Sequence, residues 1–161
     1  MAAFCRKHEI TAAHLYLAAV SYVVSRYTNN HDVFLSTISS GRSNLKIADT
    51  IGMFVNTLAI GLKIDEGTVA DYLKQVSSTF DTTLEHENYP FARINADFGF
   101  VPSIAYAYQV GVLSEYKVNG QAIGQELLEL NVPKFPINTR AARRARARTR
   151  LCPCGRAPGR P

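Results

Sequence analysis

Cysteine is scarce in this sequence, which has only Cys5, Cys152 and Cys154. A structural zinc site needs four ligands and usually has two to four residues between paired cysteines. Here a single residue separates Cys152 from Cys154, and no histidine follows them. We therefore predict no metal site, and we interpret Cys5 as an ordinary thiol in a helical stretch.

Long hydrophobic runs are also missing. No stretch of about 18 apolar residues occurs, so we expect no membrane-spanning helix and no membrane partner. The first ten residues contain Arg6, Lys7 and Glu9 where a signal peptide would need an apolar segment. These absences predict a cytoplasmic protein, and the length of 161 residues predicts a single domain.

Acidic residues are absent from the last part of the chain. Residues 1–139 combine ten basic with 13 acidic residues for a net charge of −3, whereas residues 140–161 hold eight arginines and no acid for +8. We therefore divide the chain into a globular part, residues 1–138, and an Arg-rich tail, residues 139–161. The tail is consistent with a disordered extension, an arm that grips nucleic-acid phosphates, or an artefact of frameshift or fusion. Because it has one leucine and no aromatic residue, we expect its removal to leave the fold intact.

Two common catalytic motifs are missing as well. The sequence has no Gly-x-Ser-x-Gly elbow and no phosphate-binding loop of the Walker type. Its four histidines, His8, His14, His31 and His86, stand apart from one another. We therefore assign no catalytic residue to this chain.

The residues that are present predict an α/β fold, a mixed sheet covered by helices. Alternating apolar and β-branched runs predict strands at Val33–Ile38, Met53–Leu62 and Ile104–Val110, and another that begins within Leu127–Ile137. Helical spacing predicts helices at Ala12–Tyr27, apolar nearly all round and capped by Thr11, and at Val69–Leu84, capped by Asp65 or Thr68. We expect loops at 39–44 and 86–102 and a turn at Val118–Gln121. Since both faces of Met53–Leu62 are mostly apolar, we expect this strand at the centre of the sheet.

The segment Gly52-Met53-Phe54-Val55-Asn56-Thr57-Leu58 places polar side chains in an otherwise apolar strand. Its simplest interpretation is an ordinary buried strand after a turn glycine. Buried amides must find partners, however, because an unsatisfied one costs roughly 1–3 kcal/mol. We therefore expect Asn56 either to pin a neighbouring loop or to line a cavity.

A second segment, His86-Glu87-Asn88-Tyr89-Pro90-Phe91, follows the second predicted helix. Its simplest interpretation is a helix end and a loop, in which Pro90 fixes the exit direction. A lone histidine at such a place is more often a cap or a surface residue than a catalyst. No partner that would orient His86 as a base is evident from the spacing.

In this order the two segments resemble motifs of the condensation domains of nonribosomal peptide synthetases. The first resembles the family's Gly-x-Phe-Val-Asn-Thr strand, preceded by its Ser-Gly-Arg step at 40–42, and the second its His-Gln-x-x-Pro-Phe loop. Glu87 replaces the usual Gln, Ala92 replaces the usual Glu, and the stretch 95–103 keeps only Pro102 of an Arg-Asp-x-Ser-Arg-Asn-Pro-Leu segment. The resemblance covers residues 2–137 and matches the C-terminal half of such a domain. The family's catalytic His-His-x-x-x-Asp-Gly motif belongs to the other half and is nowhere in this chain.

The resemblance implies one lobe of the CoA-dependent acyltransferase-like fold of chloramphenicol acetyltransferase, in which two lobes form a V around a tunnel. In the intact enzyme of secondary-metabolite biosynthesis, carrier proteins present phosphopantetheine-linked substrates, and no cofactor is bound permanently. The implied partners are the missing N-terminal lobe and the adenylation and peptidyl-carrier domains. The residues implied for the tunnel or its motifs are Arg42, Gly52, Phe54, Asn56, Thr57, His86, Pro90 and Phe91. Of these, we expect Arg42, Asn56 and Thr57 nearest the substrates.

On this interpretation the chain forms no peptide bond by itself and exposes a large apolar face where the other lobe would pack. Two alternatives stay open. One is a stand-alone acyltransferase of the same superfamily that uses a CoA thioester, which would also need the missing histidines. The other is a non-catalytic protein that binds nucleic acid through its arginine tail, which is not the partner that we expect.

Overall fold

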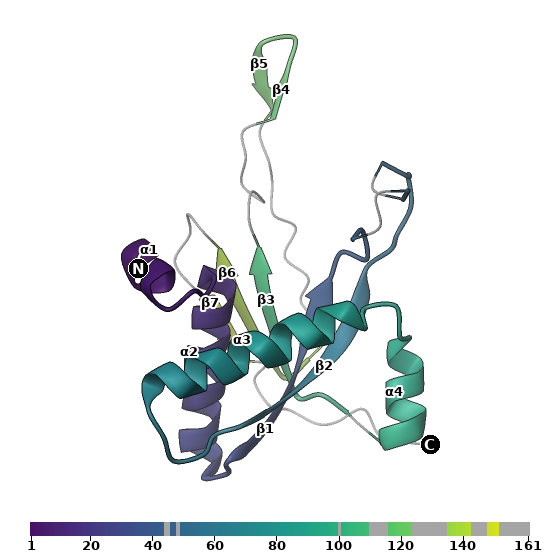
Figure 1. The fold of residues 1–161 in the computed structure, drawn as a ribbon. Helices are drawn as coiled ribbons and strands as arrows, with labels where there is room; N and C mark the ends of the chain where they lie inside the picture. Colours follow the sequence, from purple (N-terminus) through teal and green to yellow (C-terminus); the bar gives the residue numbers. More distant parts are fainter. Residues whose placement is uncertain are drawn as a thin grey trace.

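The computed structural model describes residues 1–43, 46–47, 49–99, 101–109, 116–123, 135–142 and 148–151. Within these ranges the chain forms a mixed five-stranded sheet with helices α2 and α3 packed on one face (Figure 1). A two-stranded hairpin, β4 (Tyr116–Val118) and β5 (Gln121–Ile123), contains the predicted turn. The predicted α/β class is thus confirmed. None of the helices in these ranges has the length and apolar character that crossing a bilayer requires.

The strand order in the sheet is β2-β1-β3-β6-β7. Strand β1 (Asp32–Ser39) pairs antiparallel with β2 (Asn56–Lys63) and parallel with β3 (Ile104–Gln109). Strand β3 pairs parallel with β6 (Ile137–Ala142), which pairs antiparallel with β7 (Arg148–Leu151). A parallel pair needs a long crossover, and helices α3 and α4 lie in the connection from β2 to β3.

Helix α2 (Ala12–Thr28) follows a short helix α1 (Ala2–Lys7) and begins after Thr11, the predicted N-cap, whose hydroxyl accepts a hydrogen bond from the His14 backbone N–H. Its exposure differs from the prediction of a helix buried all round. Tyr22 and Tyr27 are 50% and 89% exposed. The prediction was wrong because α2 packs on the sheet with one side only, and its tyrosines tolerate water at the other.

Helix α3 (Val69–Glu85) begins after Thr68, whose hydroxyl accepts a hydrogen bond from the Asp71 backbone N–H. This helix and α2 cover the face of the sheet on which the main core forms. The buried residues of that core are Cys5, Ile10, Leu17, Ala18, Val33, Leu35, Ile60, Leu62, Leu73, Val76, Ile104 and Tyr106. The Tyr106 hydroxyl donates to the Ala13 carbonyl at 2.7 Å, which satisfies the phenol inside the core.

Strand β2 lies at the edge of the sheet, so its predicted central position was wrong. It also begins at Asn56, three residues later than predicted. Leu58, Ile60 and Leu62 on one face are buried, as expected for a core strand. The other face carries the small residues Ala59 and Gly61, and the Phe34 ring packs close to Gly61. An apolar pattern on both faces therefore did not mean two buried faces.

The predicted loop over 86–102 contains a helix, α4 (Phe91–Phe98). Pro90 is its N-cap, and Gly99 ends it with a left-handed backbone at φ 62°. Proline at the start and glycine just past the end are ordinary helix boundaries. The aromatic and proline content of this stretch had concealed that pattern.

Part of the predicted tail is strand. Strand β6 crosses the predicted boundary at residue 138, keeping its register with β3 from Ile137 opposite Ile104 to Ala142 opposite Gln109, and β7 lies wholly beyond the boundary. For 139–142 and 148–151 the structure thus differs from a disordered tail. The division at residue 138 is otherwise untested. Three predictions concern residues outside the described ranges. They are the absence of a metal at Cys152 and Cys154, the strand end at Val110, and the start of the strand predicted within 127–134.

Candidate functional site

Arg42 holds the loop that leads into β2. Its guanidinium donates hydrogen bonds to three backbone carbonyls, those of Ile47 at 3.0 Å, Thr50 at 2.8 Å and Gly52 at 2.9 Å. The same guanidinium lies over the Phe54 ring, 4.8 Å from its centroid. A planar cation with five donors suits this combination of carbonyl and aromatic contacts. Arg42 therefore shapes the loop through its main chain.

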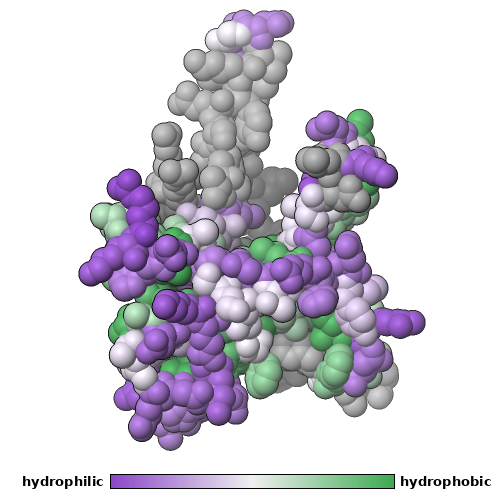
Figure 2. Space-filling view, viewed as in Figure 1, coloured by the Kyte–Doolittle hydropathy of each residue, from purple (hydrophilic) through white to green (hydrophobic). Residues whose placement is uncertain are grey.

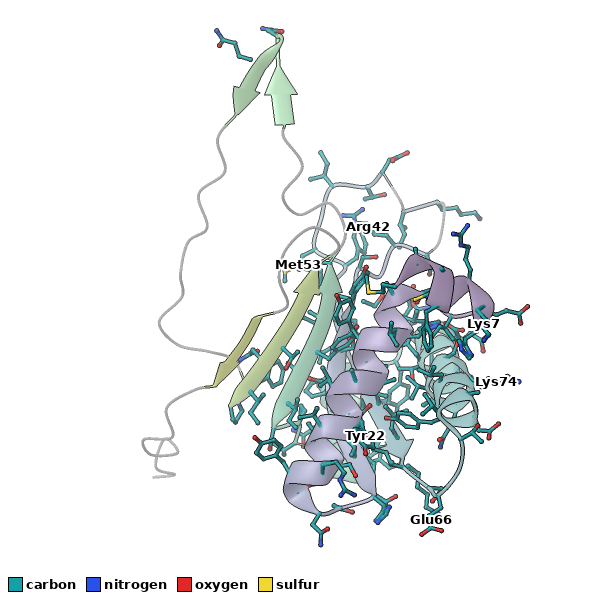
Figure 3. All side chains as sticks on the ribbon, turned by 90° about the vertical axis from the view of Figure 1, so that its left-hand side faces the viewer. Lys7, Tyr22, Arg42, Met53, Glu66 and Lys74 are labelled. Carbon is teal, nitrogen blue, oxygen red and sulfur yellow. The ribbon has the colours of Figure 1, made fainter. Side chains whose placement is uncertain are left out.

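The Gly41-Arg42 step packs against the Gly-x-Phe segment at Phe54. Gly41 has a left-handed backbone at φ 65°, and a Cβ atom there would lie 2.0 Å from the Phe54 carbonyl oxygen. A Cβ atom on Gly52 would lie 3.3 Å from the Phe54 ring. Figure 3 shows Arg42 and Met53 close together at this end of the molecule. Gly41 thus allows the two segments to approach each other, and Gly52 leaves room for the Phe54 ring within its own segment.

Asn56, the first residue of β2, pins the turn between α3 and α4. Its side-chain Nδ2 donates to the carbonyl oxygens of Glu87 at 2.7 Å and Tyr89 at 2.8 Å. Of the two predicted roles for this amide, loop pinning is the one confirmed. The two predicted motifs, which are some 30 residues apart in the sequence, therefore meet through the hydrogen bonds of a single side chain.

Glu87 connects this turn to the end of β1. Its side chain is buried, and its carboxylate accepts hydrogen bonds from the hydroxyls of Ser39 and Ser43. The Ser39 hydroxyl oxygen in turn accepts from the Gly41 backbone N–H at 3.1 Å. The Ser39 hydrogen bond, followed by that of Ser43, lowers the pKa of Glu87, while burial acts in the opposite direction. Sequence reasoning noted Glu87 only as a departure from glutamine and missed this role.

The predicted site residues thus fall into three groups. Arg42, Gly52 and Phe54 form the loop contact, and Asn56 joins that end of β2 to the turn at 86–90. Thr57 is buried beside Asn56. The remaining three lie around the turn itself and are His86 at the C-cap of α3, Pro90 at the N-cap of α4 and Phe91 as the first residue of α4. Their contact with a substrate stays a prediction.

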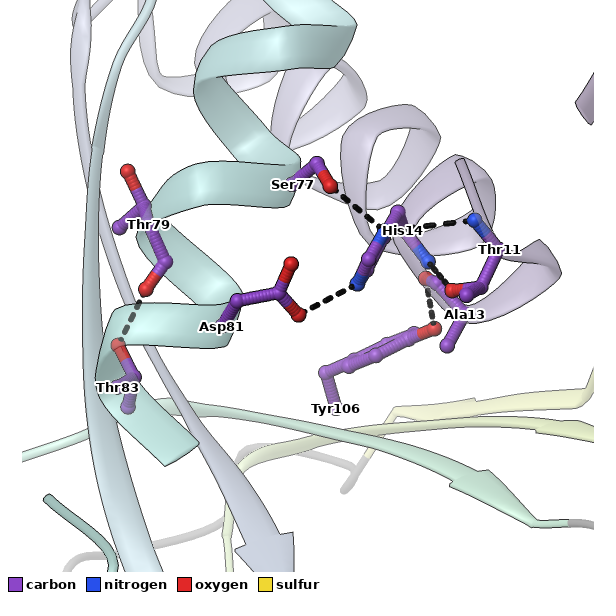
Figure 4. Close-up of polar contacts among 8 residues, drawn as sticks. All are labelled: Thr11, Ala13, His14, Ser77, Thr79, Asp81, Thr83 and Tyr106. Atoms are coloured by element: carbon purple, nitrogen blue, oxygen red, sulfur yellow. Dashed lines mark hydrogen bonds and ion pairs between the residues drawn. The ribbon is translucent and has the colours of Figure 1, made fainter. Parts of the chain in front are cut away.

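A Ser–His–Asp cluster lies elsewhere, between α2 and α3 (Figure 4). His14 Nδ1 is 2.9 Å from the Ser77 hydroxyl, and His14 Nε2 is 3.2 Å from an Asp81 carboxylate oxygen. A hydrolytic triad also needs donors for an oxyanion beside the nucleophile. Ser77 is inside α3, whose backbone N–H groups are used by the helix, and His14 is buried and also accepts from the Thr11 N–H at 3.4 Å. We interpret the cluster as a clamp between two helices.

A groove of about 860 Å³ runs along the middle of β2, between the C-terminal half of α3 and α4. The residues that line it are Phe34, Leu58, Ala59, Ile60, Gly61, Ser78, Thr79, Thr82, Thr83, His86, Tyr89, Ile94 and Phe98. Figure 2 shows residues of intermediate hydropathy (white) and hydrophobic residues (green) just below the part of the surface formed by α3. Sequence reasoning missed this groove. Its available signal was the repeat of Ser78, Thr79, Thr82 and Thr83 at the four-residue spacing of one helix face.

Comparison with known families gives a match to the condensation domain over residues 1–103, which is well over half of the chain. The chain belongs to the condensation-domain family. Surfactin synthase subunit 2 of Bacillus subtilis (strain 168) is 37% identical over 83 residues, a segment that is 50% of this chain and 2% of that protein. The first condensation domain of the CDA synthetase matches with a TM-score of 0.68 and 19% identity, covering 86% of this chain and 32% of that one. A four-domain nonribosomal peptide synthetase bound to AMP and glycine matches with a TM-score of 0.72 and 19% identity, over 84% of this chain and 12% of that one.

The condensation-domain fragment described here is therefore a small part of the proteins that it resembles. It spans about 2% of the length of the surfactin synthase subunit and about a third of the solved condensation domain. The solved structures support the fold, and the family match supports the assignment to nonribosomal peptide synthetase condensation domains. The relatives are multidomain proteins, as the four-domain synthetase illustrates.

Proposed function

We propose that this chain is the C-terminal part of a condensation domain and supplies one wall of the tunnel in which that domain forms an amide bond. The observation that carries the proposal is the junction at Asn56. One side chain there connects the Gly-x-Phe-Val-Asn-Thr strand to the turn of the second motif. The two motifs that define the resemblance thus lie in contact at the start of β2.

Within that wall, we assign Arg42 and Asn56 to positioning neighbouring backbone segments and not to contact with the substrates. Arg42 was predicted near the substrates, but its guanidinium is engaged with three backbone carbonyls and the Phe54 ring. We therefore assign Arg42 to positioning the loop before β2, and Asn56 to positioning the turn after α3. Thr57 remains the predicted residue of this group that would lie closest to a substrate.

The proposed reaction joins two substrates that carrier proteins deliver as phosphopantetheine thioesters. The acceptor amine nitrogen attacks the donor thioester carbonyl carbon, the new C–N bond forms, and the C–S bond breaks to release the carrier thiol. The amine must lose a proton during this attack, and a positioned imidazole is the usual base. The His-His-x-x-x-Asp-Gly motif that would provide it is not in this sequence, so we expect the remaining lobe to contribute that group.

The test supplies the chain with aminoacyl donor and acceptor carrier proteins and measures amide product by mass spectrometry. We expect no product from the chain alone, and product when an N-terminal lobe that carries the histidine motif is added. Asn56→Leu should lower the yield of the mixture, and Asn88→Leu, in the exposed part of the same turn, should not. Product from the chain alone, or an associated pair of lobes that stays inactive, would contradict the proposal.

Two further assays, one with a CoA thioester and one with DNA or RNA, distinguish the two other functions. A stand-alone acyltransferase would accept the donor as a CoA thioester without carrier proteins. A nucleic-acid-binding protein would retain DNA or RNA in a way that falls steeply with salt, because counterions are released on binding. The match to condensation domains favours neither of these alternatives.

A further inference from the structure

The outer edge of β2 presents backbone hydrogen-bonding groups to the groove. The Ile64 N–H donates to the His31 carbonyl at 2.8 Å, just before the β1–β2 register that places Asp32 opposite Lys63. Hydrogen-bonded and non-hydrogen-bonded pairs alternate along an antiparallel ladder. The backbone groups of Leu58, Ile60 and Leu62 therefore point toward β1.

The alternate residues point the other way. By the same alternation, the N–H and C=O groups of Thr57, Ala59 and Gly61 face the free edge, along which no strand pairs within the described ranges. Ala59 and Gly61 both line the groove. Their small side chains leave this part of the edge accessible, whereas proteins usually protect edges with charges, prolines or bulges.

The walls of the groove differ in chemistry. On the α3 side they carry the hydroxyls of Ser78, Thr79, Thr82 and Thr83, and on the α4 side the apolar side chains of Ile94 and Phe98. Phe98 is 77% exposed, so its ring is available to a partner. An extended chain placed along β2 would turn alternate side chains toward opposite sides.

We propose that this groove binds an extended peptide segment, which adds to the sheet as a strand beside β2. The occupant follows from three features together. The outward backbone groups match the hydrogen-bonding pattern of another strand, the groove extends along several strand residues, and its two walls differ in chemistry. The segment would place small hydroxyl-bearing side chains toward α3 and larger apolar side chains toward Phe98. Addition of a strand to a sheet edge is a known mode of peptide recognition. The proposal does not rest on the proposed function, because it is argued from the edge of β2 and the walls of α3 and α4 alone. The groove does share His86 and Tyr89 with the turn that Asn56 holds.

The direct test uses the full chain and a fluorescein-labelled peptide, Lys-Thr-Val-Thr-Val-Thr-Val-Lys, followed by fluorescence anisotropy. Two further peptides carry N-methyl groups on alternate residues, one on the threonines and one on the valines. Only one of these sets has its N–H groups toward β2. We expect one methylated peptide to bind about tenfold or more weakly, as loss of two or three backbone hydrogen bonds requires, and the other to bind like the parent. No binding of the parent, or equal binding of all three, would overturn the proposal.

A matched pair of protein variants locates the binding site. Thr82→Arg places a long side chain in the groove, whereas Gln75→Arg places the same side chain elsewhere on the exposed surface of α3. Arginine has a higher helix propensity than threonine and about the same as glutamine, so neither change should unfold α3. We expect Thr82→Arg to weaken peptide binding at least fivefold and Gln75→Arg to leave it unchanged. Equal effects of the two variants would place the peptide outside the groove and overturn the proposal.

Discussion

Asn56 and Asn88 are two amides near the same turn with different expected contributions to stability. Asn56→Leu removes the donor to the carbonyls of Glu87 and Tyr89, whereas Asn88 is exposed. We expect Asn56→Leu to destabilise the chain by about 1–3 kcal/mol and Asn88→Leu to change its stability little. Urea unfolding of both variants measures this difference. Equal midpoints would show that the turn does not depend on the amide.

Glu87 gives a prediction about acid. Its pKa in the folded chain lies below the ordinary value of 4.5, chiefly through the Ser39 hydrogen bond. The stabilisation from the carboxylate is therefore complete above pH 4.5 and is lost as the pH falls through the lowered folded-state pKa. Glu87→Gln removes this titration. We expect the difference in stability between the native chain and Glu87→Gln to shrink between pH 6 and pH 3, as chemical unfolding at each pH would measure.

A difference that stays constant with pH would mean that the Glu87 carboxylate is not linked to folding. Asp97→Asn serves as the matched control, since this exposed carboxylate accepts from the Tyr89 hydroxyl at 2.7 Å and lies outside the serine network. At the residue scale, then, sequence predicted that Asn56 needs a partner. It could not predict the Glu87 network, because serines 44 and 48 positions away along the chain supply the donors.

The strand β6 allows the predicted tail to be divided by experiment. Deleting 143–161 keeps β6, whereas deleting 137–161 also removes the strand that pairs with β3 along its whole length. We expect the longer deletion to lower the melting temperature clearly more than the shorter one, because it exposes Ile104 and Tyr106 and removes the buried Thr139. Thermal unfolding by circular dichroism compares the two. Equal melting temperatures would support the earlier prediction that removal from Thr139 leaves the fold intact.

The elements were predicted unevenly, for physical reasons. Helices α2 and α3 have capping threonines and long apolar stripes, so local sequence was sufficient to find them. The edge position of β2 depends on which strand lies beside it, which no local pattern contains. The same holds for β6, where Thr139 to Ala142 of a seemingly separate tail continue a parallel strand because β3 provides its hydrogen-bonding partner.

The whole fragment is expected to self-associate through its uncovered apolar residues. Ile51 and Met53 are 101% and 89% exposed, and further exposed apolar side chains lie on the same loop and on the sheet face opposite α2 and α3. Large apolar patches favour association. We expect the native chain to bind a hydrophobic dye and to sediment partly as oligomers, and the double change of Ile51 and Met53 to Asp to reduce both signals. The matched control is Val69→Asp, at the exposed start of α3.

A dye-silent monomer would show that the fragment is self-sufficient and would weaken the proposal of a missing lobe. At this scale the sequence predicted the family through two short motifs and the α/β class through the spacing of its apolar residues, and both predictions are confirmed. It could not predict the groove beside β2, because α3, β2 and α4 create it only when they come together in the folded chain.

The position of β1 in the sheet has a consequence for the order of folding. On one side β1 pairs with β2, the next strand in the chain, but on the other it pairs with β3, so that Ser36 lies opposite Ala105. Contacts between distant residues require the closure of long loops and slow the search for the native state. The β1–β2 hairpin with α3 can therefore assemble first from local contacts. Until β3 arrives, the inner edge of β1 is unpaired, and this interval is when a nascent chain would be most exposed to mispairing with another strand.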